Sequence, residues 1–356
     1  MSVFPSFLGA AAEGAQRNLT VTIVIIAIAL IFDYCNGFHD SANSIATLVA
    51  TRALSPKYAV IWAAFFNFAA AFILGLAVAG TIATKIVRPD AATNLVVFSA
   101  LVGAIGWNLI TWYFGIPSSS SHALIGGFVG AGFAFGGTDK VLWGSLTMPL
   151  LGIILAPTLC LALGYLTMLA ILWICRNSAP HSVNRTFNWL QFVAAAVYSI
   201  SHGGNDAQKT IGIVAALLVG EHFLVPKDAA VGLTGAEIPY WVVIAAFMAI
   251  TLGTLSGGWR IVKTMGMRIT KLRPADGFAA AMAGGVLIIG FTGLGVPVST
   301  THSIAGSIMG VGATKGLSAV RWGVSANIVW AWILTIPASA LISILTYWIC
   351  HALAGV

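Results

Sequence analysis

Apolar stretches separated by short polar segments run along almost the whole chain. About 20 apolar residues in a helix cross a hydrocarbon core of about 30 Å. The stretch 141–175 is too long for one perpendicular span, which predicts either a tilted helix or two pieces. We therefore predict an all-α polytopic membrane protein with about ten to twelve membrane segments, half-helices included. The clearest runs are Val21–Phe32, which extends toward Gly37, then Tyr58–Gly80, Leu95–Phe114, Val141–Cys175, Tyr240–Ser256 and Val324–Ile349.

Composition favours lipid over water as the solvent of this protein. Hydrophobic residues make up 59% of the 356 residues and charged residues only 8%, whereas soluble proteins carry about 25% charged residues. The formal net charge of +7 does not indicate a nucleic-acid partner, because the basic residues lie in short loops and not on one face. We expect a multi-pass integral protein of the cell membrane, with the lipid bilayer as its surroundings.

Four pairs of short strings occur in the same order in the two halves of the chain, which predicts a duplication. We expect an N-terminal membrane repeat over 18–175, a short cytoplasmic linker over 176–186 and a C-terminal inverted repeat over 187–350. The pairs are Asn36–Asp40 with His202–Asp206, Gly115–His122 with Gly295–His302, Trp143-Gly144 with Trp322-Gly323, and Pro157 with Pro337.

Loop charges favour opposite insertion of the two repeats. Arg52 and Lys57 make the segment 51–57 basic, whereas the corresponding segment 220–238 is net acidic. In the next pair of corresponding segments the difference in charge is reversed. Segment 81–92 is nearly neutral, whereas 259–273 carries five basic residues. Basic loops stay in the cytoplasm, so this alternation is typical of the inverted repeats of secondary transporters.

Three of the ten acidic residues, Asp33, Asp40 and Asp206, fall inside the apolar stretches. A carboxylate inside the bilayer costs several kcal/mol unless it is paired, hydrated or bound to a cation. Asp40 and Asp206 stand at matching positions of the repeat, so we predict that they bind the coupling cation. The alternative is that each caps a helix. Asp33 has no counterpart, and both site support and packing remain open for it.

Glycines and hydroxyl-rich turns surround these aspartates. Gly37, Gly203 and Gly204 predict helix breaks near the membrane midplane, where free backbone groups can line a polar cavity. Pro117 and Pro297 predict that one segment ends and a half-helix begins. Such an N-terminus offers amides, a positive dipole and hydroxyls to an oxyanion, although serine-rich turns are often only caps. The predicted phosphate ligands here are Ser118, Ser119, Ser120, Ser121, Ser299, Thr300 and Thr301.

An anion site beside two carboxylates requires a cation that enters with the anion. Like charges a few ångströms apart repel by roughly 4 kcal/mol at an effective dielectric constant near 20. Protons, sodium or a divalent metal carried with the anion would remove this repulsion. Hydrogen phosphate also carries a proton that a carboxylate can accept, and sulfate does not. His39, His122, His202 and His302 lie within the strings, which makes proton handling or ligand contact as plausible as a structural role.

The strings GFHDSANSIAT and GGNDAQKTIGI, with the two Pro-Ser/Thr-His strings, resemble the PiT family of inorganic phosphate transporters. The resemblance covers roughly 20–350 and implies inverted repeats with phosphate and cations bound between the halves. It implies that Asp40, Asn43, Asn205 and Asp206 form the polar core, and that the hydroxyl strings contact phosphate and cations. We group Asn205 and Thr210 with the phosphate ligands. The expected coupling residues are Asp40, Asp206, Asn43, Lys209, His39, His122 and His302.

Two residues depart from the family pattern. His39 replaces the asparagine before the first aspartate, and Lys209 stands where the second repeat often has asparagine. We hypothesise that Lys209 supplies a fixed positive charge where sodium binds in sodium-coupled relatives, which would make this a proton-coupled form. The alternative is that Lys209 only pairs with Asp206, three residues earlier on the same helical face.

These features predict secondary active uptake of inorganic phosphate coupled to protons or sodium, with protons favoured. Transport of a metal–phosphate complex, uptake of another tetrahedral oxyanion such as sulfate, and an anion channel remain alternatives. We expect no enzyme, because the sequence lacks a Gly-x-Ser-x-Gly elbow and a His-Glu-x-x-His motif. We expect no cofactor and no resident metal beyond a cation at Asp40 and Asp206, and a homo-oligomer remains open.

Overall fold

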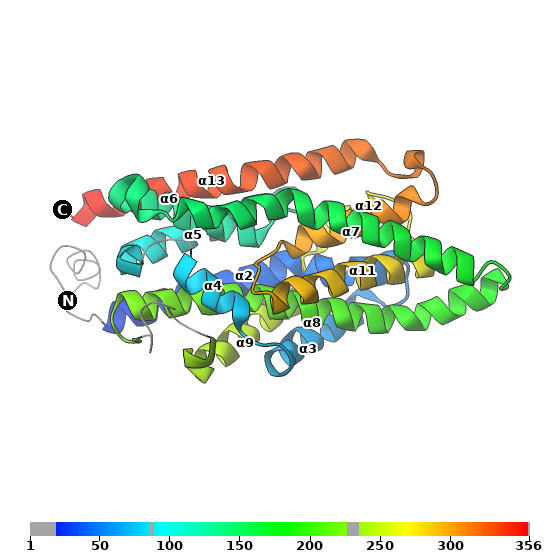
Figure 1. Ribbon diagram of the computed structural model, residues 1–356, viewed down its shortest axis with the longest axis horizontal. Coiled ribbons are helices and arrows are strands. Elements are labelled where there is room, and N and C mark those ends of the chain that lie inside the picture. The colour runs from blue at the N-terminus through cyan, green and yellow to red at the C-terminus, as the bar shows by residue number, and fades with distance from the viewer. Residues whose placement is uncertain (1–18, 86–88, 226–234, 355–356) are drawn as a thin grey trace.

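The computed structural model describes residues 19–85, 89–225 and 235–354, and these residues form an elongated bundle of helices without a strand (Figure 1). This confirms the predicted all-α fold. Short 3₁₀ turns connect some of the helices. The α-helices are α2 (Leu19–Ala50), α3 (Pro56–Ile73), α4 (Ala77–Lys85), α5 (Asn94–Phe114), α6 (Ser120–Gly136), α7 (Thr147–Ile174), α8 (Pro180–Gly220), α9 (Tyr240–Ser256), α10 (Trp259–Met267), α11 (Pro274–Gly293), α12 (Thr300–Ala313) and α13 (Trp322–Ala354).

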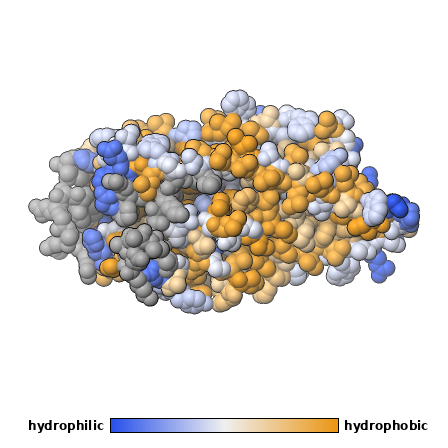
Figure 2. All heavy atoms as spheres, viewed as in Figure 1, coloured by the Kyte–Doolittle hydropathy of each residue, from blue (hydrophilic) through white to orange (hydrophobic). Residues whose placement is uncertain are grey.

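Six of these helices are long and apolar enough to cross a membrane, namely α2, α3, α5, α7, α11 and α13. The pair α9 and α10, bent by 72° at a short break, adds a seventh candidate span. The long apolar run 141–175 forms one helix, α7, after a 3₁₀ turn at Trp143–Leu146. Figure 2 shows hydrophobic side chains over the middle of one face and hydrophilic ones toward both ends, as expected for a membrane protein.

The two halves of the chain repeat the same order of elements. Long helices α2 and α8 are followed by the pairs α3–α4 and α9–α10, then by α5–α6 and α11–α12, and finally by α7 and α13 with internal prolines. Matching helices run in opposite directions, because α2 and α7 point toward the end of the molecule where α8 and α13 begin (Figure 1). The boundaries of the repeats stay predictions. Helix α8 already starts at Pro180, inside the predicted linker, because proline fits the first turn of a helix.

The predicted helix breaks at Gly37, Gly203 and Gly204 are wrong. Helices α2 and α8 run through these glycines without interruption, so their backbone groups stay hydrogen-bonded within the membrane. The glycines instead permit close helix packing. A Cβ atom at Gly37 would collide with the Ile250 carbonyl oxygen of α9, and one at Gly203 would lie 2.6 Å from the Asn67 carbonyl oxygen of α3. Small residues at such contacts let helix backbones approach each other.

Substitution of Gly37 by alanine should therefore destabilise the protein. The backbone of α9 cannot yield like a flexible side chain, so we expect a loss of about 1–3 kcal/mol and a lower melting temperature in detergent. Gly290→Ala is the matched control, because nothing lies within 4 Å of a Cβ atom at that position and alanine favours a helix interior. Equal melting temperatures for the two variants would contradict this role of Gly37.

Candidate functional site

Two short helices begin near the middle of the bundle with equivalent caps. Ser119, the N-cap of α6, accepts a hydrogen bond from the His122 amide through Oγ at 3.2 Å. Ser299, the N-cap of α12, accepts from the His302 amide at the same distance of 3.2 Å. The predicted half-helices after Pro117 and Pro297 are thus present. Both present the positive end of a helix dipole and amides that precede the first intrahelical bond.

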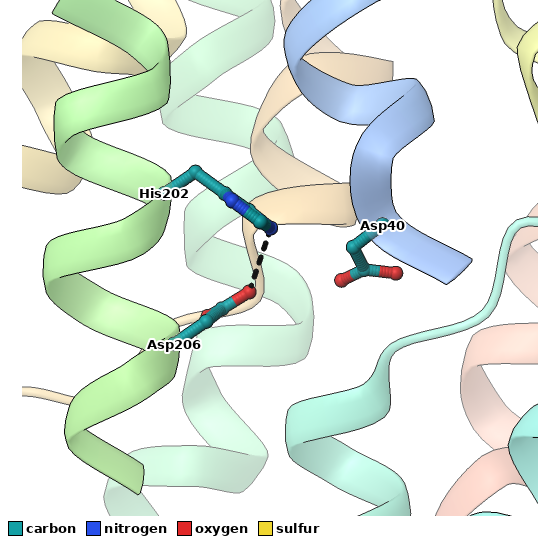
Figure 3. A group of neighbouring side chains, drawn as sticks. All are labelled: Asp40, His202 and Asp206. Atoms are coloured by element: carbon teal, nitrogen blue, oxygen red, sulfur yellow. Dashed lines mark ion pairs between the residues drawn. The ribbon is translucent and has the colours of Figure 1, made fainter. Parts of the chain in front are cut away.

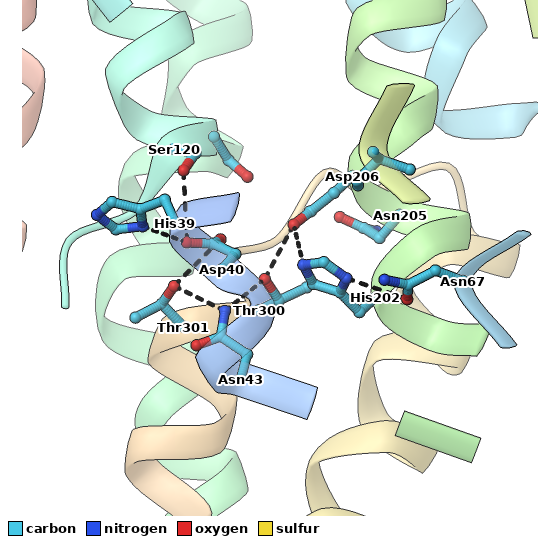
Figure 4. Close-up of polar contacts among 12 residues, drawn as sticks. His39, Asp40, Asn43, Asn67, Ser120, His202, Asn205, Asp206, Thr300 and Thr301 are labelled. Carbon is cyan, nitrogen blue, oxygen red and sulfur yellow. Dashed lines mark hydrogen bonds and ion pairs between the residues drawn. The ribbon is translucent and has the colours of Figure 1, made fainter. Parts of the chain in front are cut away.

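Asp40 on α2 lies against both hydroxyl strings (Figure 4). Its Oδ1 atom is 2.5 Å from His39 Nδ1 and accepts a hydrogen bond from Ser120 at 3.4 Å. Its Oδ2 atom accepts from Thr301 Oγ1 at 3.3 Å. On the other side of the imidazole ring, His39 Nε2 is 3.3 Å from Ser118 Oγ. The carboxylate therefore contacts the first residues of helices from both halves of the chain.

Asp206 on α8 has a stronger cationic partner. Lys209 Nζ lies 2.5 Å from Asp206 Oδ1, and it also donates to Ser121 Oγ and, at 2.9 Å, to the Val298 carbonyl oxygen. The Oδ2 atom accepts from Thr300 Oγ1 at 3.0 Å and is 3.2 Å from His202 Nε2. The pairing expected as an alternative role for Lys209 is therefore present, together with contacts to both hydroxyl strings.

The two aspartates belong to one buried cluster of polar side chains, which we call the central chamber. One carboxylate oxygen each from Asp40 and Asp206 and one ring nitrogen of His202 all lie within 4.8 Å of one another (Figure 3). Asn43 Nδ2 joins the two sides, because it donates to Thr301 Oγ1 at 3.0 Å and to Thr300 Oγ1 at 3.3 Å. The duplicated strings thus converge as the sequence predicted.

This chamber is closed to solvent and short of positive charge. The side chains that form it are at most 5% exposed. Two carboxylates face one lysine, and at a separation of no more than 4.8 Å they repel each other by at least about 3–4 kcal/mol at an effective dielectric constant near 20. A proton or metal cation shared by Asp40, His202 and Asp206 would relieve this repulsion. An oxyanion would then meet donors on two helix N-termini.

Other predicted site residues lie next to the chamber and make different contacts. Asn205 connects α8 to the α11–α12 break, because it donates to Thr292 Oγ1 at 2.8 Å and accepts from the Val298 amide at 3.3 Å. His122 and His302 face each other with ring centroids 4.8 Å apart, and His302 stacks on Trp332 at 4.0 Å. Within the described residues, neither ring hydrogen-bonds to Asp40 or Asp206.

Asp33 and Thr210 form a second buried polar group. Asp33 is fully buried, and it forms no ion pair within the described residues. Thr210 and Asn36 adjoin its carboxylate, and the charges of Asp206 and Lys209 act on it. Thr210 thus lies with Asp33, whereas the Asp206 carboxylate contacts His202, Lys209 and Thr300.

Sequence reasoning gave His202 no separate coupling role and missed its neighbour Asn67. His202 Nδ1 is 3.3 Å from Asn67 Oδ1, and Asn67 Nδ2 donates to Thr254 Oγ1 at 2.9 Å. Asn67 is the one amide within the apolar segment 56–73, and a polar residue inside a membrane helix is a functional candidate by default. A lone amide in an apolar segment is therefore the sequence signal that points to Asn67.

Comparisons with known proteins agree on one family. Residues 36–343 match the profile of the phosphate transporter family. A probable low-affinity inorganic phosphate transporter of Rhizobium meliloti (strain 1021) is 52% identical over 335 residues, which cover 94% of this chain and 97% of that protein. Its counterpart in Bacillus subtilis (strain 168) is 41% identical over 333 residues, covering 93% and 97%. A solved structure of a sodium-dependent phosphate transporter superposes with a TM-score of 0.81 at 27% identity, covering 93% of this chain and 98% of that one.

Proposed function

Because this chain belongs to the phosphate transporter family, we propose that it accumulates inorganic phosphate across the cell membrane by symport with protons. The family assignment confirms the resemblance found in the motifs, and the fold is that of a multi-pass integral membrane protein. The observation that carries the proposal is the meeting of two carboxylates within 4.8 Å at the N-termini of two capped half-helices.

Phosphate would bind between the two half-helices. Ser120 and Ser121 on one side and Thr300 and Thr301 on the other supply hydroxyls and helix-terminal amides, which favour an oxyanion. The negative charge of Asp40 and Asp206 opposes binding unless positive charge enters as well. A proton on phosphate or on a carboxylate supplies that charge inside the chamber.

Lys209 favours protons over sodium as the coupling ion. Its ammonium group already occupies the space between Asp206, Ser121 and the Val298 carbonyl oxygen, where these oxygen ligands would otherwise suit a monovalent metal cation. Coupling to sodium is the main alternative, because the structurally similar transporter is sodium-dependent. Asp33 is an additional carboxylate that a proton could occupy, because it is buried and forms no ion pair within the described residues.

Transport of a metal–phosphate complex is a second candidate, favoured by the grouping of Asp40, His202 and Asp206. Carboxylate oxygens and an imidazole nitrogen are ligands that divalent metals accept. The closed chamber also requires a conformational change before phosphate can enter or leave, as in alternating access. Such a change distinguishes a transporter from an anion channel, and no catalytic step is part of the proposal.

Uptake of labelled phosphate into proteoliposomes tests this function. Saturable accumulation above the equilibrium level is expected, with competition by arsenate and little competition by sulfate. Omission of divalent ions and addition of a chelator should leave uptake unchanged if phosphate travels alone, and should abolish it if the metal complex is the substrate. Uptake that only equilibrates phosphate would indicate a channel, and equal competition by sulfate would contradict phosphate selectivity.

Replacement of Thr301 by valine should weaken phosphate handling without loss of the fold. Valine keeps the shape but removes a hydroxyl that bonds Asp40 and Asn43, and a hydrogen bond to a charged group contributes about 1.5–3 kcal/mol. We expect phosphate KM to rise by about tenfold or more. Ser303→Ala is the control, because its hydroxyl donates to the Ser299 carbonyl oxygen one turn earlier and adjoins Cys160 on α7. A normal KM in Thr301→Val would remove this residue from the site.

A further inference from the structure

A strongly basic pocket lies at the α10–α11 and α12–α13 connections. The α12–α13 connection lies toward the end of the molecule where α7 turns into α8 (Figure 1). The pocket encloses about 380 Å³ between these connections. Four of its seven lining residues are basic, and two others carry hydroxyl groups. The polar lining residues are Thr270, Lys271, Arg273, Lys315, Ser318 and Arg321.

A second pocket of about 500 Å³ adjoins the first, because Arg273 and Lys315 line both. Its wall is largely apolar, with Met168, Ile171 and Leu172 of α7 and Val183 of α8. Arg176 stands on its rim. The two pockets together therefore offer a basic chamber next to a hydrophobic wall.

The positive charge of this region is poorly compensated. Asp276 is the one acidic residue that lines either pocket, and Lys315 already forms an ion pair with it. Lys315 also donates to the Lys271 carbonyl oxygen at 2.7 Å, which ties the two connections together. Lys271, Arg273 and Arg321 are exposed and are available to an anionic group.

Exposed tryptophans place these pockets at the level of the lipid headgroups. Trp173 is 67% exposed and Trp322 46% exposed. Arg176 lies over the ring of Trp173 at 5.0 Å from its centroid, and Trp322 directly follows Arg321 in the sequence. Tryptophan gathers at the membrane–water interface, and the excess of basic residues marks this end as cytoplasmic.

We propose that the two pockets form one binding site for an acidic phospholipid of the cytoplasmic leaflet. The phosphate-bearing headgroup lies among Lys271, Arg273 and Arg321, and an acyl chain follows the apolar wall of α7 and α8. Basic pockets between membrane helices on this side are suited to anionic headgroups. Free phosphate would use the same cations, but it would leave the apolar wall without an occupant. The lipid would also stabilise the α10–α11 and α12–α13 connections, which flank the segment that contains α11 and α12.

Lipid titration of the detergent-solubilised full chain, followed by native mass spectrometry, tests this site. The probes are dioleoyl phosphatidylglycerol, dioleoyl phosphatidylcholine and inorganic phosphate. Each basic residue near an anionic group contributes about fivefold in affinity. The variant Lys271→Gln/Arg321→Gln should therefore lose at least tenfold in phosphatidylglycerol affinity and keep its weak affinity for phosphatidylcholine. The variant Lys57→Gln/Lys263→Gln removes the same charge at exposed positions that line neither pocket, and it should bind phosphatidylglycerol like the unaltered chain.

Three results would overturn the proposal. Equal affinity of the unaltered chain for the two lipids would exclude headgroup recognition. An equal loss of phosphatidylglycerol affinity in both double variants would show that only the net charge of the protein matters. Displacement of phosphatidylglycerol by equimolar inorganic phosphate would show that the basic side chains of the pockets bind free phosphate. The measurement reads lipid binding and not transport, so its outcome does not depend on the coupling ion or on phosphate uptake.

Discussion

Replacement of Asp40 or Asp206 by asparagine is expected to lower phosphate accumulation at least a hundredfold, a loss of about 2.7 kcal/mol. Asparagine keeps the shape of the side chain but can neither take up a proton nor neutralise a cation. In Asp206→Asn the Lys209 ammonium also loses its carboxylate partner at 2.5 Å, and an unpaired buried charge costs about 3–5 kcal/mol. Within the described part of the chain, His39 is the one ionisable hydrogen-bond partner of Asp40, so the Asp40→Asn variant should fold more readily.

Accumulation of labelled phosphate under an imposed pH gradient measures this effect, with expression and melting temperature recorded for each variant. Asp139→Asn serves as the control, because Asp139 is exposed at the end of the molecule and should not affect uptake. Near-normal accumulation in both Asp40→Asn and Asp206→Asn would remove these carboxylates from the mechanism.

The second large effect concerns Lys209. Replacement by asparagine removes the fixed ammonium beside Asp206 and leaves an amide with Ser121 and the Val298 carbonyl oxygen around it. We expect uptake in sodium-free buffer to fall on the order of a hundredfold, because the buried carboxylate then lacks its partner. Sodium should restore at least a tenth of the uptake, since a mobile monovalent cation can bind in place of the ammonium group.

Phosphate uptake with and without sodium, measured on the same vesicles, separates these effects. Lys140→Asn is the matched control, because Lys140 forms an ion pair of 2.5 Å with Asp90 in a partly exposed position. That variant should keep uptake that is independent of sodium. A sodium requirement in the unaltered chain, or no response to sodium in Lys209→Asn, would contradict the role given to Lys209.

The convergence of Asp40 and Asp206 was predictable from the sequence, because a duplicated string containing a carboxylate is typical of a site between two repeats. The half-helices after Pro117 and Pro297 were predictable for a similar reason, since proline and serine end one helix and cap the next. Both predictions depend on short motifs whose local chemistry is the same in the two repeats.

The role of Gly37 was not predictable in the same way. Glycine permits both a helix break and a close helix contact, and the choice depends on the distant Ile250 carbonyl oxygen of α9. The orientation of the hydroxyls is a similar case. Ser119 and Ser299 are occupied as caps, and only the folded geometry shows that their neighbours face the aspartates.

The hydrogen-bond partner of Asn67 was also not predictable from the sequence. Its contact with His202 joins α3 to α8, and 135 residues separate the two in the chain. A single amide in an apolar helix indicates a polar partner but does not identify it. The facing rings of His122 and His302 likewise require the first turns of α6 and α12 to lie close together, which no local pattern fixes.

The most direct measurement of coupling uses proteoliposomes that enclose a pH-sensitive dye. Labelled phosphate is added to the external buffer. With an acidic exterior and no sodium, symport predicts that phosphate accumulates inside above its equilibrium level while the interior acidifies in proportion. Phosphate that accumulates only with a sodium gradient, without a change in the internal pH, would contradict proton coupling at Asp40 and Asp206.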